Sequence, residues 1–153
     1  MLSLSANRVG MACILGLDVG TVRIGVSRAS NGAMAIAAPL CTVKRTGVRD
    51  DVARLAKIGQ EQGAVAVVVG LPYDLDGNEG RSARLARQVG DALGAATGLP
   101  VYYQDERFST VEASHRLHAG GRSARDQRGV IDQAAAAVIL QDWLDRPERG
   151  DLR

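Results

Sequence analysis

The sequence has few aromatic residues, few cysteines and no long hydrophobic run. Aromatic residues make up only 3% of the 153 residues, so a core must consist mainly of Val, Ile, Leu and Ala. The two cysteines, Cys13 and Cys41, form no C-x-x-C pair, and we expect reduced thiols in a cytoplasmic protein. No apolar run approaches the roughly 20 residues that span a bilayer, which argues against membrane association. Basic and acidic residues number 19 and 17, so net charge alone does not indicate a nucleic-acid-binding protein.

The length and composition indicate one globular domain. A hydrophobic content of 46% and a charged content of 24% are ordinary for such a domain. We expect the domain to span residues 12–145. Residues 1–11 and 146–153 are expected to be flexible extensions, and the first of these lacks the features of a signal peptide.

Hydrophobic patterning predicts a mixture of strands and helices, which is typical of the α/β class. Short apolar or β-branched runs predict strands at 13–17, 24–27, 34–43, 64–69 and 101–104. Helical periodicity predicts helices at 48–62, 81–97, 109–119 and 130–144. This order indicates an antiparallel meander followed by a parallel half with right-handed crossovers. Pro39 places the third strand at an edge of the sheet, and the Gly-, Arg- and Ser-rich segment 120–129 is predicted to be a mobile loop.

Asp18 stands at the end of the first predicted strand, directly before a glycine turn. Gly20 suits that turn and lets a ligand approach the backbone closely. This arrangement suits metal or phosphate chemistry. An isolated acid at such a position can equally serve only to shape the turn, so the interpretation depends on whether other carboxylates reach the same place.

Three further acids could do so. Asp105 and Glu106 end the fifth predicted strand, and Asp132 begins the last predicted helix on its apolar face. Each has a structural alternative: Asp132 could complement the helix dipole, and the adjacent pair could be a solvated strand end. Clustered carboxylates repel one another, however, and such a cluster suits divalent cations. Two ions roughly 4 Å apart would activate water and stabilise the leaving oxygen at a phosphodiester.

Basic and hydroxyl side chains could hold the phosphates of a nucleic acid near these acids. Thr21 and Arg23 follow Asp18 closely, and Arg23 could neutralise either that carboxylate or a phosphate. Four further arginines could contact the nucleic-acid backbone without reading its sequence: Arg107, Arg122, Arg125 and Arg128. The alternative for the last three is a solvated loop. Arg81, Arg84 and Arg87 also recur at helical spacing.

Four motifs occur in a fixed order along the chain. They are Leu17-Asp18-x-Gly20-Thr21-x-Arg23-Ile24-Gly25, Val69-Gly70-Leu71-Pro72, Asp105-Glu106-Arg107-Phe108-Ser109-Thr110, and Asp132-Gln-Ala-Ala-Ala with Ile139-Leu140-Gln141. Each motif is weak alone, but together they are specific, and over roughly 12–144 the chain resembles the YqgF (RuvX-like) family. The resemblance implies an RNase H-like fold with a mixed five-stranded sheet of order 3-2-1-4-5 flanked by helices. It also implies a nuclease that acts with Mg²⁺ or Mn²⁺.

The resemblance places Asp18, Glu106 and Asp132 at the acidic positions of the family, as catalytic residues and metal ligands. In the related RuvC-type resolvases, the second acid ends the fourth strand, where this chain has Gly70. The acid must then come from the fifth strand, and adjacent strands lie about 4.8 Å apart. The longer side chain of Glu106 is therefore favoured over that of Asp105, which stays the alternative.

The sequence thus predicts a divalent-metal-dependent nuclease that hydrolyses phosphodiester bonds in structured RNA or branched DNA. Family members are described as candidate Holliday junction resolvases and as nucleases that trim the 5′ end of precursor 16S rRNA. We expect a cytoplasmic monomer or weak homodimer. Two alternatives are a non-catalytic RNA- or ribosome-binding factor and an actin-like kinase or chaperone ATPase. The latter is disfavoured because those proteins need two such domains around the nucleotide.

Overall fold

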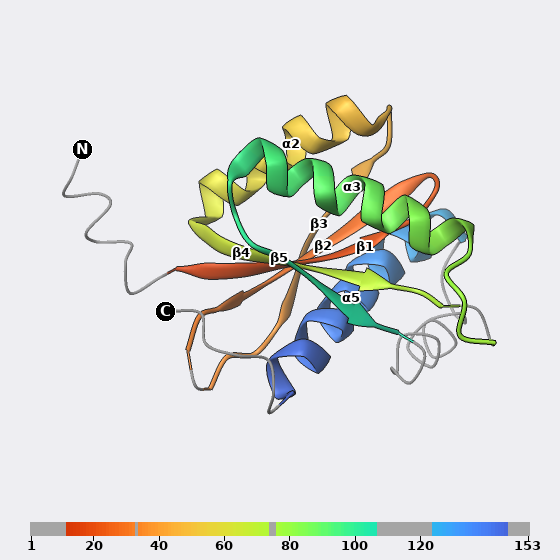
Figure 1. The fold of residues 1–153 in the computed structure, drawn as a ribbon. Coiled ribbons are helices and arrows are strands. Elements are labelled where there is room, and N and C mark those ends of the chain that lie inside the picture. The colour runs from red at the N-terminus through yellow and green to blue at the C-terminus, as the bar shows by residue number, and fades with distance from the viewer. Residues whose placement is uncertain (1–11, 33, 74–75, 107–123, 147–153) are drawn as a thin grey trace.

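The computed structural model of the protein describes residues 12–32, 34–73, 76–106 and 124–146. Within these ranges, five strands form one sheet and three helices pack against it (Figure 1). The helix expected at 109–119 and both expected terminal extensions, except Arg146, lie outside the described residues. None of the three helices is long and apolar enough to cross a membrane.

The five strands form a mixed sheet in the predicted order. They are β1 (Cys13–Val19), β2 (Arg23–Ser30), β3 (Ala38–Lys44), β4 (Ala64–Leu71) and β5 (Val101–Asp105). The sheet order is β3-β2-β1-β4-β5, with β1, β2 and β3 antiparallel and both β4 and β5 parallel to β1. Pro39 lies on the edge strand β3, as predicted, beside a register shift between Val26 and Ser27 of β2. At such an edge, the missing N–H of proline costs the sheet little.

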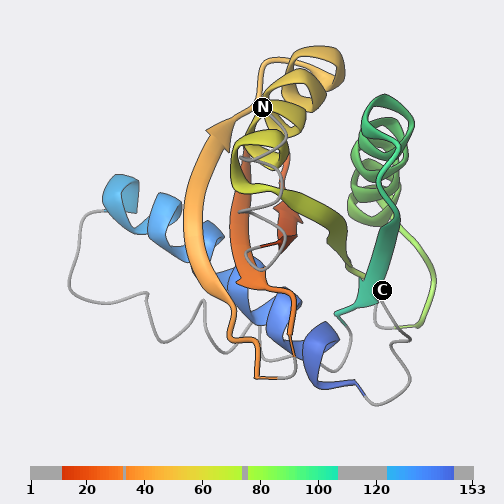
Figure 2. The ribbon, with the colours of Figure 1, turned by 90° about the vertical axis from the view of Figure 1, so that its left-hand side faces the viewer.

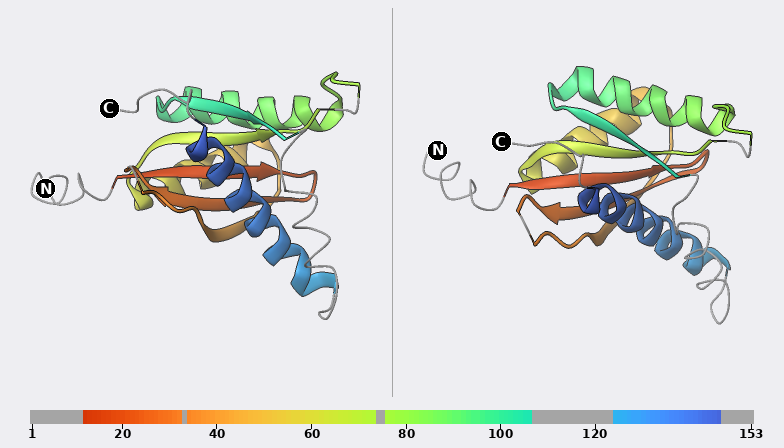
Figure 3. Two further views of the ribbon diagram at one scale, coloured as in Figure 1. Left: turned by 90° about the horizontal axis from the view of Figure 1, so that it is seen from below. Right: turned by 60° about the horizontal axis from the view of Figure 1, so that its bottom comes forward.

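The helices cover opposite faces of the sheet. Helices α2 (Val48–Gln62) and α3 (Arg81–Thr97) pack side by side on one face and have the predicted bounds. Helix α5 (Ala124–Asp145) crosses the other face obliquely (Figures 2 and 3). The prediction of a loop up to residue 129 was wrong for 124–129, which is helical. The carbonyl oxygen of Gly129 accepts a hydrogen bond from Thr42 Oγ1 of β3 at 3.0 Å, a tertiary contact that local sequence does not reveal.

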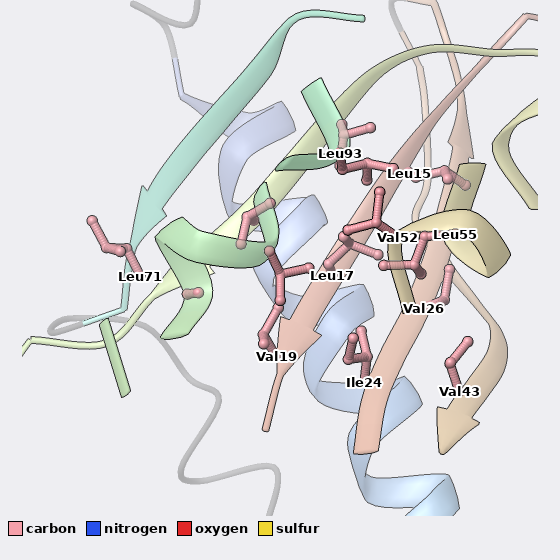
Figure 4. Close-up of a cluster of buried hydrophobic side chains, with 14 of the residues drawn as sticks. Leu15, Leu17, Val19, Ile24, Val26, Val43, Val52, Leu55, Leu71 and Leu93 are labelled. Atoms are coloured by element: carbon pink, nitrogen blue, oxygen red, sulfur yellow. The ribbon is translucent and has the colours of Figure 1, made fainter. Parts of the chain in front are cut away.

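Each face of the sheet has its own hydrophobic core. The larger core lies between the sheet and helices α2 and α3 (Figure 4), and its buried members include Leu15, Leu17, Ile24, Val26, Leu55, Val67, Val69 and Leu93. The core under α5 includes Ile14, Val68, Ala135, Ala136, Ile139, Leu140 and Trp143. Because side chains alternate along a strand, β1 directs its odd-numbered residues to the larger core. Asp18 therefore lies on the face that α5 covers.

Helix α5 lies close to the sheet because the strands beneath it carry glycine. A Cβ atom added at Gly16 would lie only 2.9 Å from the backbone oxygen of Ala136, and one at Gly25 would overlap the backbone carbonyl group of Asp132. The hydroxyl of Ser27 also donates a hydrogen bond to the Ala136 oxygen at 2.8 Å. Glycine at these strand positions thus sets the height of the helix above the sheet.

We expect the substitution Gly25→Ala to destabilise the protein by roughly 1–3 kcal/mol, the usual cost of overpacking a well-packed core. Urea unfolding monitored by circular dichroism measures the change. Gly32→Ala is the matched control, because a Cβ at that exposed glycine meets nothing within 4 Å and its φ is not positive. If Gly25→Ala cost no more than Gly32→Ala, the close contact of α5 would be contradicted.

Candidate active site

Asp18 and Glu106 occupy the same end and the same face of the sheet. Asp18 is the penultimate residue of β1, and Glu106 directly follows β5, where its N–H donates to the Leu71 carbonyl oxygen at 3.2 Å. Tyr103 packs in the core under α3, whereas Tyr102 packs in the core under α5. Since side chains alternate along β5, Glu106 follows Tyr102 to the α5 face. Asp105 falls on the α3 face.

The glycine between these two acids explains how Glu106 comes near Asp18. Strand β4 separates β1 from β5, and its residue Gly70 is next to Asp18 because Leu17 pairs with Val69. A Cβ atom added at Gly70 would lie 2.8 Å from Glu106 Oε2. The Glu106 carboxylate therefore occupies the space above Gly70 that a side chain would fill, and it needs to span only one strand.

The two acids are partly buried and electrostatically coupled. Burial and, to a smaller extent, the negative charge of Asp132 together raise the pKa of Asp18 to about 7. Burial likewise raises the pKa of Glu106 to about 8, with additional contributions from the charges of Asp18 and Asp105. The charge of Asp132 thus acts on Asp18, and the charge of Asp18 acts on Glu106. Strongly perturbed carboxyl groups of this kind are typical of functional sites.

Asp132 approaches the same place from α5 and is bound to an arginine. The Nε of Arg23 donates a hydrogen bond to Asp132 Oδ2 at 2.7 Å, and the two side chains are 29% and 19% exposed. Arg23 begins β2, directly after the turn in which the N–H of Gly20 donates to the Arg23 carbonyl oxygen. This ion pair ties β2 to α5, and Thr21 is exposed in the turn beside it.

The chemistry of these residues fits a divalent cation. Asp18 and Glu106 offer hard oxygen ligands, and a cation would relieve the repulsion between them. In the part of the chain that the structure describes, no group of three His, Cys, Asp or Glu side chains is placed to hold a metal ion. Asp132 is engaged by Arg23, and Asp105 lies on the other face. The pair Asp18 and Glu106 is therefore the candidate ligand set, with Asp132 next to it.

The remaining expected phosphate-binding arginines are not placed by the structure. Arg107 and Arg122 lie outside the described residues, as do the side chains of Arg125 and Arg128 within α5. Sequence reasoning missed the role of Gly70. The signal was present, because a glycine that ends a β-branched strand indicates close approach of another group.

Comparison with known proteins identifies the family of this chain. The family model described as "RuvX: Holliday junction resolvase" matches residues 12–146. A protein of Anaeromyxobacter dehalogenans named "Putative pre-16S rRNA nuclease" is 51% identical over 132 residues, which cover 86% of this chain and 96% of that protein. A protein of the same name from Thermosynechococcus vestitus is 43% identical, with 88% of this chain and 89% of that protein covered.

Solved structures show the same architecture. RuvC of Thermus thermophilus in complex with a Holliday junction substrate matches with a TM-score of 0.54 over 84% of this chain and 91% of that one. At 17% identity, this likeness concerns the fold, which is RNase H-like. The fold places the protein in the class of RNase H-like proteins. Within that class, the chain belongs to the RuvX family.

We expect Asp18→Asn and Glu106→Gln each to stabilise the metal-free protein at pH 8. A carboxyl group whose pKa is raised by folding stabilises the native state below its unfolded pKa of about 4, and this stability is lost as the pH rises through about 7 for Asp18 and about 8 for Glu106. A neutral amide avoids that loss. The gain in Tm should be on the order of 2–4 °C for each kcal/mol relieved.

Thermal unfolding in EDTA at pH 5 and pH 8 measures this effect, and the gain should shrink at pH 5. The control variant is Asp50→Asn, which removes an exposed carboxylate from the first turn of α2 and should give no gain. Equal Tm values for wild type and both site variants at pH 8 would contradict the assigned electrostatics.

Proposed function

We propose that the protein is a divalent-metal-dependent nuclease that hydrolyses phosphodiester bonds in structured nucleic acid, with Asp18 and Glu106 as the residues that hold Mg²⁺ or Mn²⁺. One observation carries the proposal: the partly buried carboxyl groups of Asp18 and Glu106 meet beside Gly70 at one end of the sheet, with Asp132 next to them. Membership in the RuvX family supports it. The names of the relatives favour precursor 16S rRNA as the substrate, and the description of the family model makes branched DNA the second candidate.

A bound divalent cation would supply Lewis-acid stabilisation of the phosphate and lower the pKa of an attacking water. The side chains prepare that chemistry. With a pKa of about 8, the Glu106 carboxyl group holds a proton at neutral pH, and cation binding must displace it. Cation affinity should therefore rise with pH.

Arg23 and Thr21 lie where a phosphate would meet the acids. The Arg23 guanidinium is partly exposed beside Asp132, so it can compensate negative charge on either the carboxylate or a phosphate that approaches it. Thr21 presents a hydroxyl and a backbone N–H from the turn after β1. Contacts of this kind position a nucleic-acid backbone without reading its sequence. A cytoplasmic location and a monomeric or weakly dimeric state are parts of the same proposal.

Cleavage assays test the activity directly. Wild-type protein with Mg²⁺ or Mn²⁺ should cleave a precursor 16S rRNA fragment, a four-way DNA junction, or both, and EDTA should abolish the cleavage. Asp18→Asn should lower the rate by at least roughly 10²-fold, the scale of losing one catalytic electrostatic contact. Asp50→Asn should retain the wild-type rate.

If the wild-type protein cleaved neither substrate faster than Asp18→Asn does, the nuclease proposal would be wrong. The alternative is then a non-catalytic RNA- or ribosome-binding factor, and the bound state of Asp132 on Arg23 is the observation that favours it. A cellular assay separates the two functions. A variant with Asp18→Asn and Asp132→Asn should fail to replace the wild type if the protein is a nuclease and should replace it if the protein only binds.

A further inference from the structure

An arginine-lined hollow lies across the β1–β2 turn from the acidic cluster. Its volume is about 530 Å³, and it is lined by Thr21, Arg45, Arg81, Arg84, Leu85 and Gln88. Thr21 belongs to the turn between β1 and β2, Arg45 directly follows β3, and the other lining residues belong to α3. The hollow therefore adjoins the candidate active site but opens on the α3 side of the sheet.

One wall of the hollow is a fixed arginine. The Nε of Arg45 donates to Asp51 Oδ2 at 2.8 Å, and its Nη1 donates to the Gly20 carbonyl oxygen at 3.2 Å. The Arg45 side chain is only 9% exposed. The same buried Asp51 also binds Arg54 at 2.8 Å, so one carboxylate is shared by two guanidinium groups and net positive charge remains. Arg45 thus links the β1–β2 turn to α2, and these contacts fix the position of its guanidinium group beside the hollow.

The opposite wall carries two exposed arginines. Arg81 and Arg84 are exposed in the first turn of α3, which contains no acidic residue. Among the described residues, neither guanidinium group has an ion pair or hydrogen bond. Arg87, one turn further along, differs because it is bound to Glu79 by two hydrogen bonds of 2.6 Å and lies over the Tyr103 ring. The charges facing the hollow therefore select an anion.

We propose that this hollow binds backbone phosphates of the substrate strand next to the phosphate that is cleaved, so that the strand passes over the β1–β2 turn. This inference rests on the proposed nuclease function and adds Arg45, Arg81 and Arg84 to the nucleic-acid interface. Gly20 lies two residues beyond Asp18, about 7 Å along an extended chain, so one strand can contact the hollow and the acids at neighbouring phosphates. The ligand is the phosphodiester backbone of RNA or DNA, since guanidinium–phosphate contacts carry no sequence information.

The salt dependence of binding tests the proposal. Fluorescence anisotropy of a labelled precursor 16S rRNA fragment and a labelled four-way DNA junction is measured between about 50 and 200 mM salt. All variants carry Asp18→Asn so that no cleavage occurs. The plot of log Kobs against log salt has a negative slope. Adding Arg84→Gln should reduce the magnitude of that slope by about 0.7–0.9, and adding Arg81→Gln as well should double the reduction.

Lys57→Gln is the matched control, because it removes one charge from an exposed position of α2 outside the hollow. It should leave the slope unchanged. The proposal would be overturned if the magnitude of the slope did not decrease in the arginine variants, or if it decreased equally in Lys57→Gln. A decrease in the magnitude of the slope with only one of the two nucleic acids would support the proposal and identify the nucleic acid that the hollow binds.

Cleavage by the wild-type protein separates this inference from the proposed function. A fall in slope without any wild-type cleavage would leave the hollow as a nucleic-acid site and refute the nuclease. Cleavage with unchanged slopes would refute the hollow alone. Both arginines are exposed, so we expect the variants to fold, and circular dichroism verifies this. If the double substitution failed to fold, the comparison of Arg84→Gln with Lys57→Gln would test the proposal.

Discussion

The close contact between α5 and a sheet face that carries glycine is the constraint on which the site depends. Gly16 and Gly25 let the helix backbone approach the strands to a distance that any side chain would prevent. Because the Asp132 backbone itself lies against Gly25, the position of this acid is set by packing and not by its own charge. The ion pair with Arg23 then fixes its side chain. Packing of small residues thus determines where the charges of the site stand relative to one another.

The same use of glycine brings the second acid into place. Gly70 leaves a space beside Asp18, and the Glu106 carboxylate fills it from the neighbouring strand. This arrangement is electrostatically costly, since burial and like charge raise the pKa of both acids. Groups held in such unfavourable surroundings cluster at functional sites. Burial of apolar side chains in the two cores, one on each face of the sheet, offsets this destabilisation. A bound cation would reduce the repulsion between the acids.

Much of the fold follows from local patterns in the sequence. The bounds of α2 and α3 agree with their helical periodicity, and the sheet order agrees with the resemblance to the RuvX family. The start of α5 could not be predicted locally, because the Thr42–Gly129 hydrogen bond comes from a distant strand. The hydrogen-bond partners of individual side chains could not be predicted from the sequence either. Arg23 was expected beside Asp18 or a phosphate, but which carboxylate it binds depends on how α5 crosses β2.

Metal binding by Glu106, and not by its neighbour Asp105, is the central claim that can be tested most directly. Isothermal titration calorimetry with Mn²⁺ on the wild type, Glu106→Gln and Asp105→Asn compares two neighbouring acids that differ in the sheet face they occupy. We expect Glu106→Gln to weaken Mn²⁺ binding by roughly 10- to 100-fold or more, whereas Asp105→Asn should bind Mn²⁺ like the wild type. Loss of binding in Asp105→Asn with normal binding in Glu106→Gln would contradict it.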